Sequence, residues 1–515
     1  MSSSQPNRNY KFMLAESDDM TPVGWIKSAR EKKLDLALNK SGSASFRVPL
    51  TDSMAYEIIG QEVVRCVKVY CDDANGNPTI RWSGPIWTTT VSVPSESIIV
   101  NCVGWKELLD HRELRVESIF DNLDAGEIAS RLITDANHTT YLTNLLSNWS
   151  FEADAYGYTN TGYSSVARSN SWSTTGGYSE QLVAPVGTNT LDSGYVAISD
   201  STEYTSCIDL NVDATGTKSI RLDLLWYDAS KVFISTSSSS STTSSGEQSL
   251  SVTATSPVGS AYVRLRIRCA TSSGTATFYV DSGVIAAGSS TGITPTPISI
   301  GDVTVSQTRD ITFAQGTKHG AAIDSLVNME AGFDWDIDPE TREFSVLYDN
   351  VKGTIYGKGV DNVATQFSYA WGPKNVASVT VSTDSSNIAN RVNVKGTYTT
   401  AIAYDSDSIA SYGLFEDTLT VSDVVDDEIL LAYAGAETAY RLQPFKTYSF
   451  QPFPYDGTEK IPLFFDDYDI GDIVYLTAKY GALNIERQAV RVFGVSIDID
   501  NEGNEKIGEI KTVAS

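Results

Sequence analysis

Apolar and polar residues alternate along most of the chain with a period of two, the pattern of β-strands that bury one face. The alternation is clear over residues 63–69 and resumes after a turn at residues 72–78, whose Asn75-Gly76 pair is a strong hairpin signal. A further alternating segment at residues 97–103 ends the series. We therefore predict a first β-barrel formed by residues 1–118.

Two segments show apolar residues at helical spacing instead. In the first, Asp124 can cap a helix whose apolar face holds Ile128, Ala129, Leu132 and Ile133. In the second, Thr317 can cap a helix whose apolar face holds Ala321, Ala322, Leu326 and Val327. A hairpin is predicted next, at residues 333–346. The helices and hairpin would form one small α/β domain, residues 119–143 plus 291–375, if the stretch between them is an insertion.

Residues 144–290 differ in composition from the sequence on either side. They hold only two lysines and a Ser/Thr run at residues 235–245, which we interpret as a loop. Alternation is regular on both sides of that run, at residues 220–226 and 263–269. This pattern predicts an independent antiparallel β-sandwich inserted into the α/β domain.

Residues 376–515 return to alternation and predict a second β-barrel, with a final turn at residues 500–504. Five residues match characteristic positions of an EF-hand loop, four of them ligand positions and one the turn glycine: Asp498, Asp500, Glu502, Gly503 and Glu509. The segments on either side alternate as strands, however, and Glu505 stands where the loop needs an aliphatic residue. A hairpin turn is therefore the better interpretation.

Charge narrows the range of functions. A net charge of −26 argues against a surface that binds nucleic acid, because neutralising phosphates needs clustered Lys and Arg. The sequence contains no run of about 18 apolar residues, which a membrane-spanning helix would need. The first residues do not resemble a signal peptide. The five cysteines are scattered without metal-binding spacing, so we expect them to be reduced.

A search for catalytic motifs finds no nucleophile elbow, zinc-protease helix or phosphate-binding loop. The three histidines, His111, His138 and His319, stand apart from one another in the sequence. We therefore predict that the chain is not an enzyme. With 64 acidic residues, a carboxylate pair for glycoside hydrolysis remains an alternative that no spacing singles out.

The order of five segments outside the insertion resembles the baseplate-hub (minor tail) proteins of long-tailed phages, most closely those that infect actinobacteria. The segments are Trp82–Ile86 with Gly104–Leu109, Gly126–Ala129, Ala331–Trp335, Asn390–Gly396 and Ile470–Val474. The resemblance implies two hub-type barrels flanking the α/β domain. It also implies a homotrimer that joins the sixfold tail tube to a threefold tip, with the distal tail protein, the tape measure protein and other tail-tip proteins as partners. Such a protein is assembled in the host cytoplasm and resides in the virion.

The insertion resembles the jelly-roll carbohydrate-binding modules of bacterial glycoside hydrolases. The likeness rests on the start Asn144–Glu152 and on residues 224–229, 255–262 and 278–281. In that family a Glu of the opening motif and an Asp of the last strand hold a structural Ca²⁺, which implies Glu152 and Asp281 here. Two solvated acids are the alternative.

Sugar binding needs aromatic faces with polar neighbours. Five residues of the insertion are candidates on these grounds: Tyr178, Tyr227, Tyr262, Arg264 and Arg266. The arginines could meet an anionic host-envelope glycan, or they could pair with acids such as Asp223. A purely structural decoration is the competing interpretation of the whole module.

The resulting hypothesis is a structural tail-tip protein of a phage virion that would also contact host surface glycans. A tail-associated cell-wall hydrolase and a free glycan-binding protein are the alternatives. If the hub encloses a channel for DNA, acidic residues of the C-terminal region should line it. The candidates are Asp466, Asp467, Asp469, Asp472, Asp423, Asp426, Asp427 and Glu428.

Overall fold

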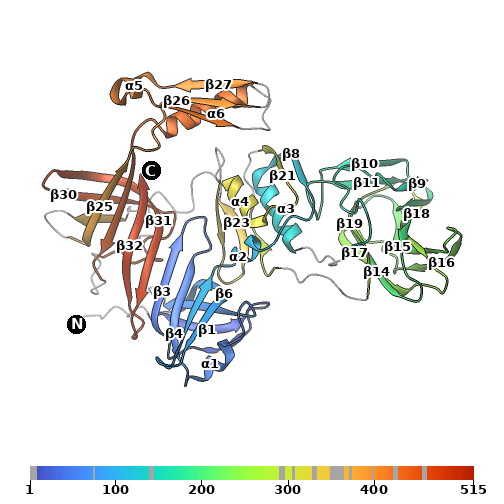
Figure 1. The fold of residues 1–515 in the computed structure, drawn as a ribbon, viewed down its shortest axis with the longest axis horizontal. Helices are drawn as coiled ribbons and strands as arrows, with labels where there is room; N and C mark the ends of the chain where they lie inside the picture. The colour runs from blue at the N-terminus through green and yellow to red at the C-terminus, as the bar shows by residue number, and fades with distance from the viewer. Residues whose placement is uncertain are drawn as a thin grey trace. The chain divides into compact units, whose positions relative to one another are not determined.

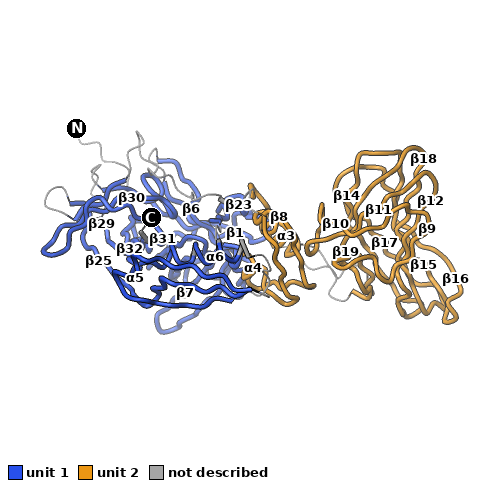
Figure 2. Tube along the Cα trace, turned by 90° about the horizontal axis from the view of Figure 1, so that it is seen from above, with its two compact units in different colours: residues 1–107, 324–515 blue, residues 108–323 orange. Residues whose placement is uncertain are grey.

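Strands make up most of the computed structural model, so the predicted mainly β, multidomain class is confirmed (Figure 1). The structure describes residues 9–72, 76–137, 144–288, 296–303, 308–327, 333–347, 365–369, 374–396, 399–420, 427–454 and 461–514. Two compact units divide the chain, residues 1–107 with 324–515 and residues 108–323 (Figure 2). No helix within these described ranges is long and apolar enough to cross a membrane.

The N-terminal part of the first unit is an antiparallel run of strands with one short helix, α1 (Ser53–Ile58). Its strands are β1 (Lys11–Glu16), β2 (Pro22–Trp25), β3 (Arg30–Ala37), β4 (Ser43–Pro49), β5 (Arg65–Asp72), β6 (Pro78–Ser92) and β7 (Ser97–Val103). Their order is β2-β1-β5-β6-β7-β4-β3. The predicted hairpin is confirmed, because β5 and β6 pair across the expected turn, with Val69 opposite Trp82.

The C-terminal part continues the same sheet. Its strands are β24 (Gln366–Tyr369), β25 (Val376–Asp384), β29 (Phe445–Pro452), β30 (Ile473–Tyr480), β31 (Leu483–Ile499) and β32 (Glu505–Ala514). β31 pairs with β3, placing Ile497 opposite Leu34, and both parts share one apolar core. The described strands form no closed barrel, because the edge of β3 that could close the first half is taken by β31. The hairpin turn at residues 500–504 is confirmed between β31 and β32.

The chain forms a small α/β layer after β25 and before β29 in the sequence. β25 and β29 themselves pair with each other. The layer contains β26 (Arg391–Lys395), β27 (Thr400–Tyr404), α5 (Ser406–Tyr412), β28 (Glu416–Thr420) and α6 (Asp427–Tyr440). Val392 and Val394 of β26 share a core with Leu430 of α6. The alternation of residues 376–515 predicts only a barrel, since these short strands show the same period as the strands around them.

The hairpin predicted after the second helix is also present in the first unit. β22 (Asp334–Ile337) pairs with β23 (Glu343–Leu347), and Trp335 stacks on Phe344 at 5.6 Å. The predicted helix before it is α4 (His319–Val327), and it starts two residues after the suggested cap.

The second unit contains the first predicted helix, α3 (Ala125–Asn137), preceded by β8 (Ser118–Asp124). The Asp124 carboxylate accepts from the N–H groups of Gly126 (2.9 Å) and Glu127 (3.3 Å), which confirms the predicted cap. β21 (Thr308–Phe313) pairs with β8. Two short elements complete this part of the fold: α2 (Glu107–Asp110) and β20 (Ser299–Ile300).

The rest of the second unit is a two-sheet β-sandwich. One sheet has the order β10-β11-β19-β14-β17; the other has the order β16-β15-β18-β12-β9, and β13 also pairs with β18. The strands are β9 (Thr159–Thr161), β10 (Ser165–Ser169), β11 (Ser179–Ala184), β12 (Gly187–Asp192), β13 (Val196–Ala197), β14 (Glu203–Val212), β15 (Thr217–Tyr227), β16 (Phe233–Ser238), β17 (Gly246–Thr255), β18 (Tyr262–Ser273) and β19 (Ala276–Ala287). Residues 235–238 of the Ser/Thr run thus belong to the edge strand β16, because Ser and Thr side chains are compatible with pairing along β15. The remainder of the run, residues 239–245, contains no strand.

The sandwich packs directly against α3 and β8 within the second unit. Arg131 of α3, only 7% exposed, donates to the carbonyls of Gly177 and Asn170, both at 2.8 Å. A side chain at Gly177 would collide with the carbonyl of Ile119 in β8. The inserted residues therefore supply partners for a buried guanidinium of the α/β domain.

Candidate functional site

Four of the predicted binding residues lie on the outer face of one sheet of the sandwich. β15 and β18 pair with Tyr227 opposite Tyr262 and with Leu225 opposite Arg264. The residues between them in sequence, such as Trp226, are fully buried in the core. Because successive side chains of a strand point to opposite faces, the tyrosines and arginines project away from the core.

The tyrosines form part of an aromatic cluster that sequence reasoning only partly identified. We define it by four residues: Tyr195, Tyr227, Tyr262 and Phe233. Tyr195, which follows β12 and is 40% exposed, lies 5.0 Å from Tyr227 and 6.0 Å from Tyr262 between ring centroids. Phe233 extends the cluster at 5.8 Å from Tyr227 and is 54% exposed. The rings of Tyr195 and Phe233 are thus partly exposed to solvent.

Arginine side chains next to this cluster are held by acids and carbonyls. Arg266 makes a two-pronged ion pair with Asp192, at 2.6 and 2.7 Å. This hydrogen bonding raises the pKa of Arg266 above its ordinary value. Arg264 donates to the carbonyl of Ser193 at 2.5 Å, and its guanidinium lies 5.0 Å from the Tyr195 ring. The arginines therefore do pair, as one alternative expected, although Arg266 pairs with Asp192 rather than with Asp223.

Tyr178 is not part of this face. It lies 8% exposed just before β11, where its hydroxyl donates to the carboxylate of Asp121 in β8. The guanidinium of Arg168 covers its ring at 3.2 Å. Its contacts join the sandwich to β8, so the structure gives Tyr178 a packing environment apart from the other four candidates.

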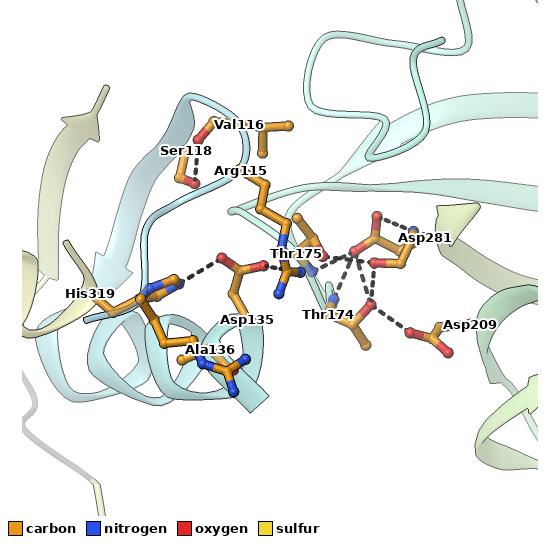
Figure 3. A network of polar contacts seen from close by, with 12 residues as sticks. Arg115, Val116, Ser118, Asp135, Ala136, Thr174, Thr175, Asp209, Asp281 and His319 are labelled. Atoms are coloured by element: carbon orange, nitrogen blue, oxygen red, sulfur yellow. Dashed lines mark hydrogen bonds and ion pairs between the residues drawn. The ribbon is translucent and has the colours of Figure 1, made fainter. Parts of the chain in front are cut away.

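The two carboxylates expected to bind calcium lie at this same end of the sandwich. Asp281, fully buried, accepts from the main-chain N–H groups of Thr174 (2.7 Å), Thr175 (2.9 Å) and Ser282 (2.7 Å) (Figure 3). Glu152 accepts from the N–H groups of Tyr178 (3.0 Å) and Gly177 (3.2 Å). Burial raises the pKa of Glu152 to about 7 and holds the pKa of Asp281 well above its ordinary range.

These contacts bear on whether calcium fits. Ca²⁺ takes six to eight oxygen ligands, whereas N–H groups already bind both carboxylates. Within the described residues, no group of three or more His, Cys, Asp or Glu side chains is arranged to hold a metal. The calcium site stays a prediction. Its two expected ligands, Glu152 and Asp281, already accept hydrogen bonds from main-chain N–H groups.

Three of the segments that carry the hub resemblance contribute contacts to one place in the first unit, through Ser83, Trp105 and Asp334. Trp105 donates its indole N–H to Ser83 Oγ (2.8 Å), which donates to the carbonyl of Pro339 (2.6 Å). Asp334, the first residue of β22, accepts a hydrogen bond from Asn39 Nδ2 at 2.8 Å and forms an ion pair with Arg491 of β31. These contacts fasten the β22–β23 hairpin to both halves of the large sheet.

The described acids of the predicted channel lining make contacts within the chain, and the channel lining itself stays a prediction. Asp466 pairs with Arg81 at 3.0 Å, and Asp467 accepts from the N–H of Leu463 at 2.6 Å. Asp472, 1% exposed, accepts from the N–H of Asp469 at 2.8 Å. Asp467 and Asp472 thus organise their own loop, and Asp466 joins that loop to β6. The side chains of Asp423, Asp426, Asp427 and Glu428 lie outside the described residues.

One buried pair escaped sequence reasoning altogether. His319 Nε2 lies 2.8 Å from Asp135 Oδ2, and the two residues are about 1% exposed (Figure 3). Sequence separation of 184 residues concealed the contact. Its burial between α3 and the start of α4 identifies it as a packing contact. His138 lies outside the described residues.

Comparisons with known proteins give no family assignment. No family model and no curated protein matches the chain. The tail protein from Neisseria meningitidis MC58 matches over 98% of this chain and 97% of its own length, at 8% identity and a TM-score of 0.44. The 43 kDa tail protein of prophage MuSo2 from Shewanella oneidensis covers 98% of both chains, at 9% identity and 0.44.

Other solved structures match only about a quarter of the chain. A family 16 carbohydrate-binding module covers 28% of this chain and 99% of its own, at 18% identity and a TM-score of 0.24. Tailspike protein 4 of bacteriophage CBA120 covers 28% of this chain, at 11% identity and 0.25. The match spans 21% of the tailspike chain. At TM-scores below 0.5, these likenesses establish neither family nor function.

The buried Glu152 carboxyl predicts a pH-dependent stability. Its pKa of about 7 exceeds the ordinary 4.5, so the folded sandwich binds more protons than the unfolded chain between these values. Stability should therefore fall as pH rises from 4.5 to 7 in calcium-free buffer, by up to about 3 kcal/mol. Glu152→Gln should reduce this slope in thermal unfolding but not remove it, because the pKa values of Asp281 and Glu180 are also raised. Glu203→Gln, at an exposed site, should leave the slope unchanged.

Calcium provides the second arm of this experiment. If the two carboxylates bind Ca²⁺ together, millimolar calcium will raise the unfolding midpoint at pH 7.5, and Glu152→Gln will abolish the rise. An unchanged midpoint would contradict the predicted calcium site. A wild-type protein without any pH slope in calcium-free buffer would contradict the raised pKa.

Proposed function

We propose that this chain is a non-enzymatic structural protein of a phage tail tip, a baseplate hub that joins tail tube to tip, and that its sandwich contacts host surface glycans. The hub role is supported by the order of the segments that resemble hub proteins, three of which contribute Ser83, Trp105 and Asp334 to the contacts around the β22–β23 hairpin. The distal tail protein, the tape measure protein and other tail-tip proteins would be its partners.

The observation that carries the glycan role is the aromatic cluster beside the Arg266–Asp192 pair. Sugar rings present C–H surfaces that stack on aromatic faces, while their hydroxyls need donors and acceptors nearby. Tyr195 and Phe233 offer exposed ring surface, and the ion pair offers both kinds of hydrogen-bonding group. Because Arg264 and Arg266 are already engaged, this face favours a neutral, hydroxyl-rich glycan over an anionic one.

The two alternatives have less support. A cell-wall hydrolase needs two carboxyl groups facing one glycosidic bond; the acids on the candidate face, Asp192 and Asp223, are each paired with an arginine. A free glycan-binding protein would leave the large first unit, with its own core, without a role. We therefore retain the tail-tip proposal.

Tyr195→Ala tests the glycan role with little risk to folding, because Tyr195 is a loop residue outside the core. Loss of one stacking partner should weaken binding to a neutral oligosaccharide by roughly tenfold, measured by titration calorimetry after screening purified protein on a glycan array. Tyr156→Ala, at an 83% exposed position of the same sandwich, serves as the matched control. Equal binding by Tyr195→Ala and wild type, or preference for anionic glycans only, would count against the proposal.

A homotrimer is the second expected property of the tail-tip protein. Each chain contributes two sheet halves, so three chains supply six similar elements around an axis, which suits a sixfold tube. Electron cryo-microscopy of the native tail should show three copies of this chain in a ring. A sixfold ring of six copies, or a single copy per tail, would refute the trimer.

A further inference from the structure

A cavity in the first unit lies apart from everything assigned above. It has a volume of about 550 Å³ and lies between the first two strands and the turn joining β31 to β32. Its lining combines three lysines, several aromatic or apolar side chains and a few polar groups of the turn. A cavity of this size accommodates a small molecule or the end of a chain.

Lys32 is the unusual residue of this lining. It lies on β3 with the same parity as the core residue Leu34, so its side chain points inward and is only 6% exposed. Among the described residues, no hydrogen bond or ion pair reaches its ammonium group. An ammonium group that is largely removed from water and makes no direct ion pair is costly, because the charges of Asp500 and Glu502 replace only part of the hydration that it loses.

Three lysines and one acid line the cavity. Lys11 and Lys27 line it with Lys32, while Glu502 is the acid of the lining. Lys11 lies 3.6 Å from Asp72. Burial lowers the pKa of Lys32, and the charges of Asp500 and Glu502 only partly oppose this effect. A ligand carrying a negative charge would supply the partner that Lys32 lacks.

The lining also contains apolar and aromatic side chains. Trp25 is 39% exposed and packs against Tyr70 at 5.2 Å, which fixes its indole plane. Phe12 and Ile26 extend this surface within the cavity. An aromatic or similarly flat group would bury apolar area here while an attached anion reached the lysines.

We propose that this cavity binds a carboxylate attached to an aromatic group, with the Lys32 ammonium as its charge partner and Trp25 against its ring. The same chemistry occurs in a free aromatic acid and in the C-terminal residue of a polypeptide that ends in an aromatic side chain. This inference is independent of the tail-tip proposal, since it rests only on the cavity lining.

Titration calorimetry of the full chain with 1-naphthoate tests the proposal. Wild type should bind 1-naphthoate at least ten times more tightly than the neutral 1-naphthalenemethanol. Lys32→Met should lose at least tenfold in affinity for 1-naphthoate. Lys33→Met is the matched control: Lys33 is the next residue of β3, points the other way and pairs with Asp35 at 2.9 Å, so its loss should leave affinity unchanged.

Stability separates loss of binding from loss of folding. Lys32→Met removes a largely buried charge that has no direct ion pair, so its unfolding midpoint should equal or exceed that of wild type. No heat with millimolar 1-naphthoate, equal affinities for the acid and the alcohol, or equal affinities of Lys32→Met and wild type would overturn the proposal.

A pair of peptides distinguishes the two sources of the ligand. One ends in phenylalanine with a free carboxylate, and the other is identical but amidated. Tighter binding of the free-acid peptide than of 1-naphthoate points to a chain end, and tighter binding of 1-naphthoate points to a small aromatic acid. An amidated peptide that binds as well as the free acid would overturn the role of the carboxylate.

Discussion

β3 and β31 lie side by side although about 460 residues separate Leu34 from its partner Ile497. Bringing such distant segments together costs loop-closure entropy, and the shared core, which holds Leu34, Ile497 and Phe464 alike, offsets that cost. Asp334 adds a further link between the two halves of the sheet, since it contacts Asn39 of one half and Arg491 of the other. The cavity beside Lys32 also depends on this pairing, because its lining comes from β3 and from the turn after β31.

Local signals predicted local structure well. The turn at residues 72–78, the Asp124 cap and the alternation around Trp226 each depend on neighbours a few residues away, and each is confirmed. Non-local pairing could not be predicted in this way. The edge of β3 shows the same alternation whether it closes a barrel or accepts β31, and the strands of the 385–444 layer have the same period as the sheet around them.

The candidate binding face shows the same division. Strand parity alone places Tyr227, Tyr262 and Arg264 on one surface, and the structure agrees. Loop residues carry no such signal, so strand parity cannot place Tyr195 on this face or separate Tyr178 from it. The Asp192 partner of Arg266 is 74 positions away in the sequence, beyond the reach of any spacing argument. Parity could have flagged Lys32, a lysine in register with core residues, as an anomaly.

One continuous sheet makes the two halves of the first unit a single body. Native-state hydrogen exchange with increasing denaturant tests this claim most directly. Amides of β3, β31 and the strands next to them should lose protection together at one denaturant concentration, and those of β14 and β19 in the sandwich at another. Loss of protection in the N-terminal strands while β29–β32 stay protected would contradict a continuous sheet.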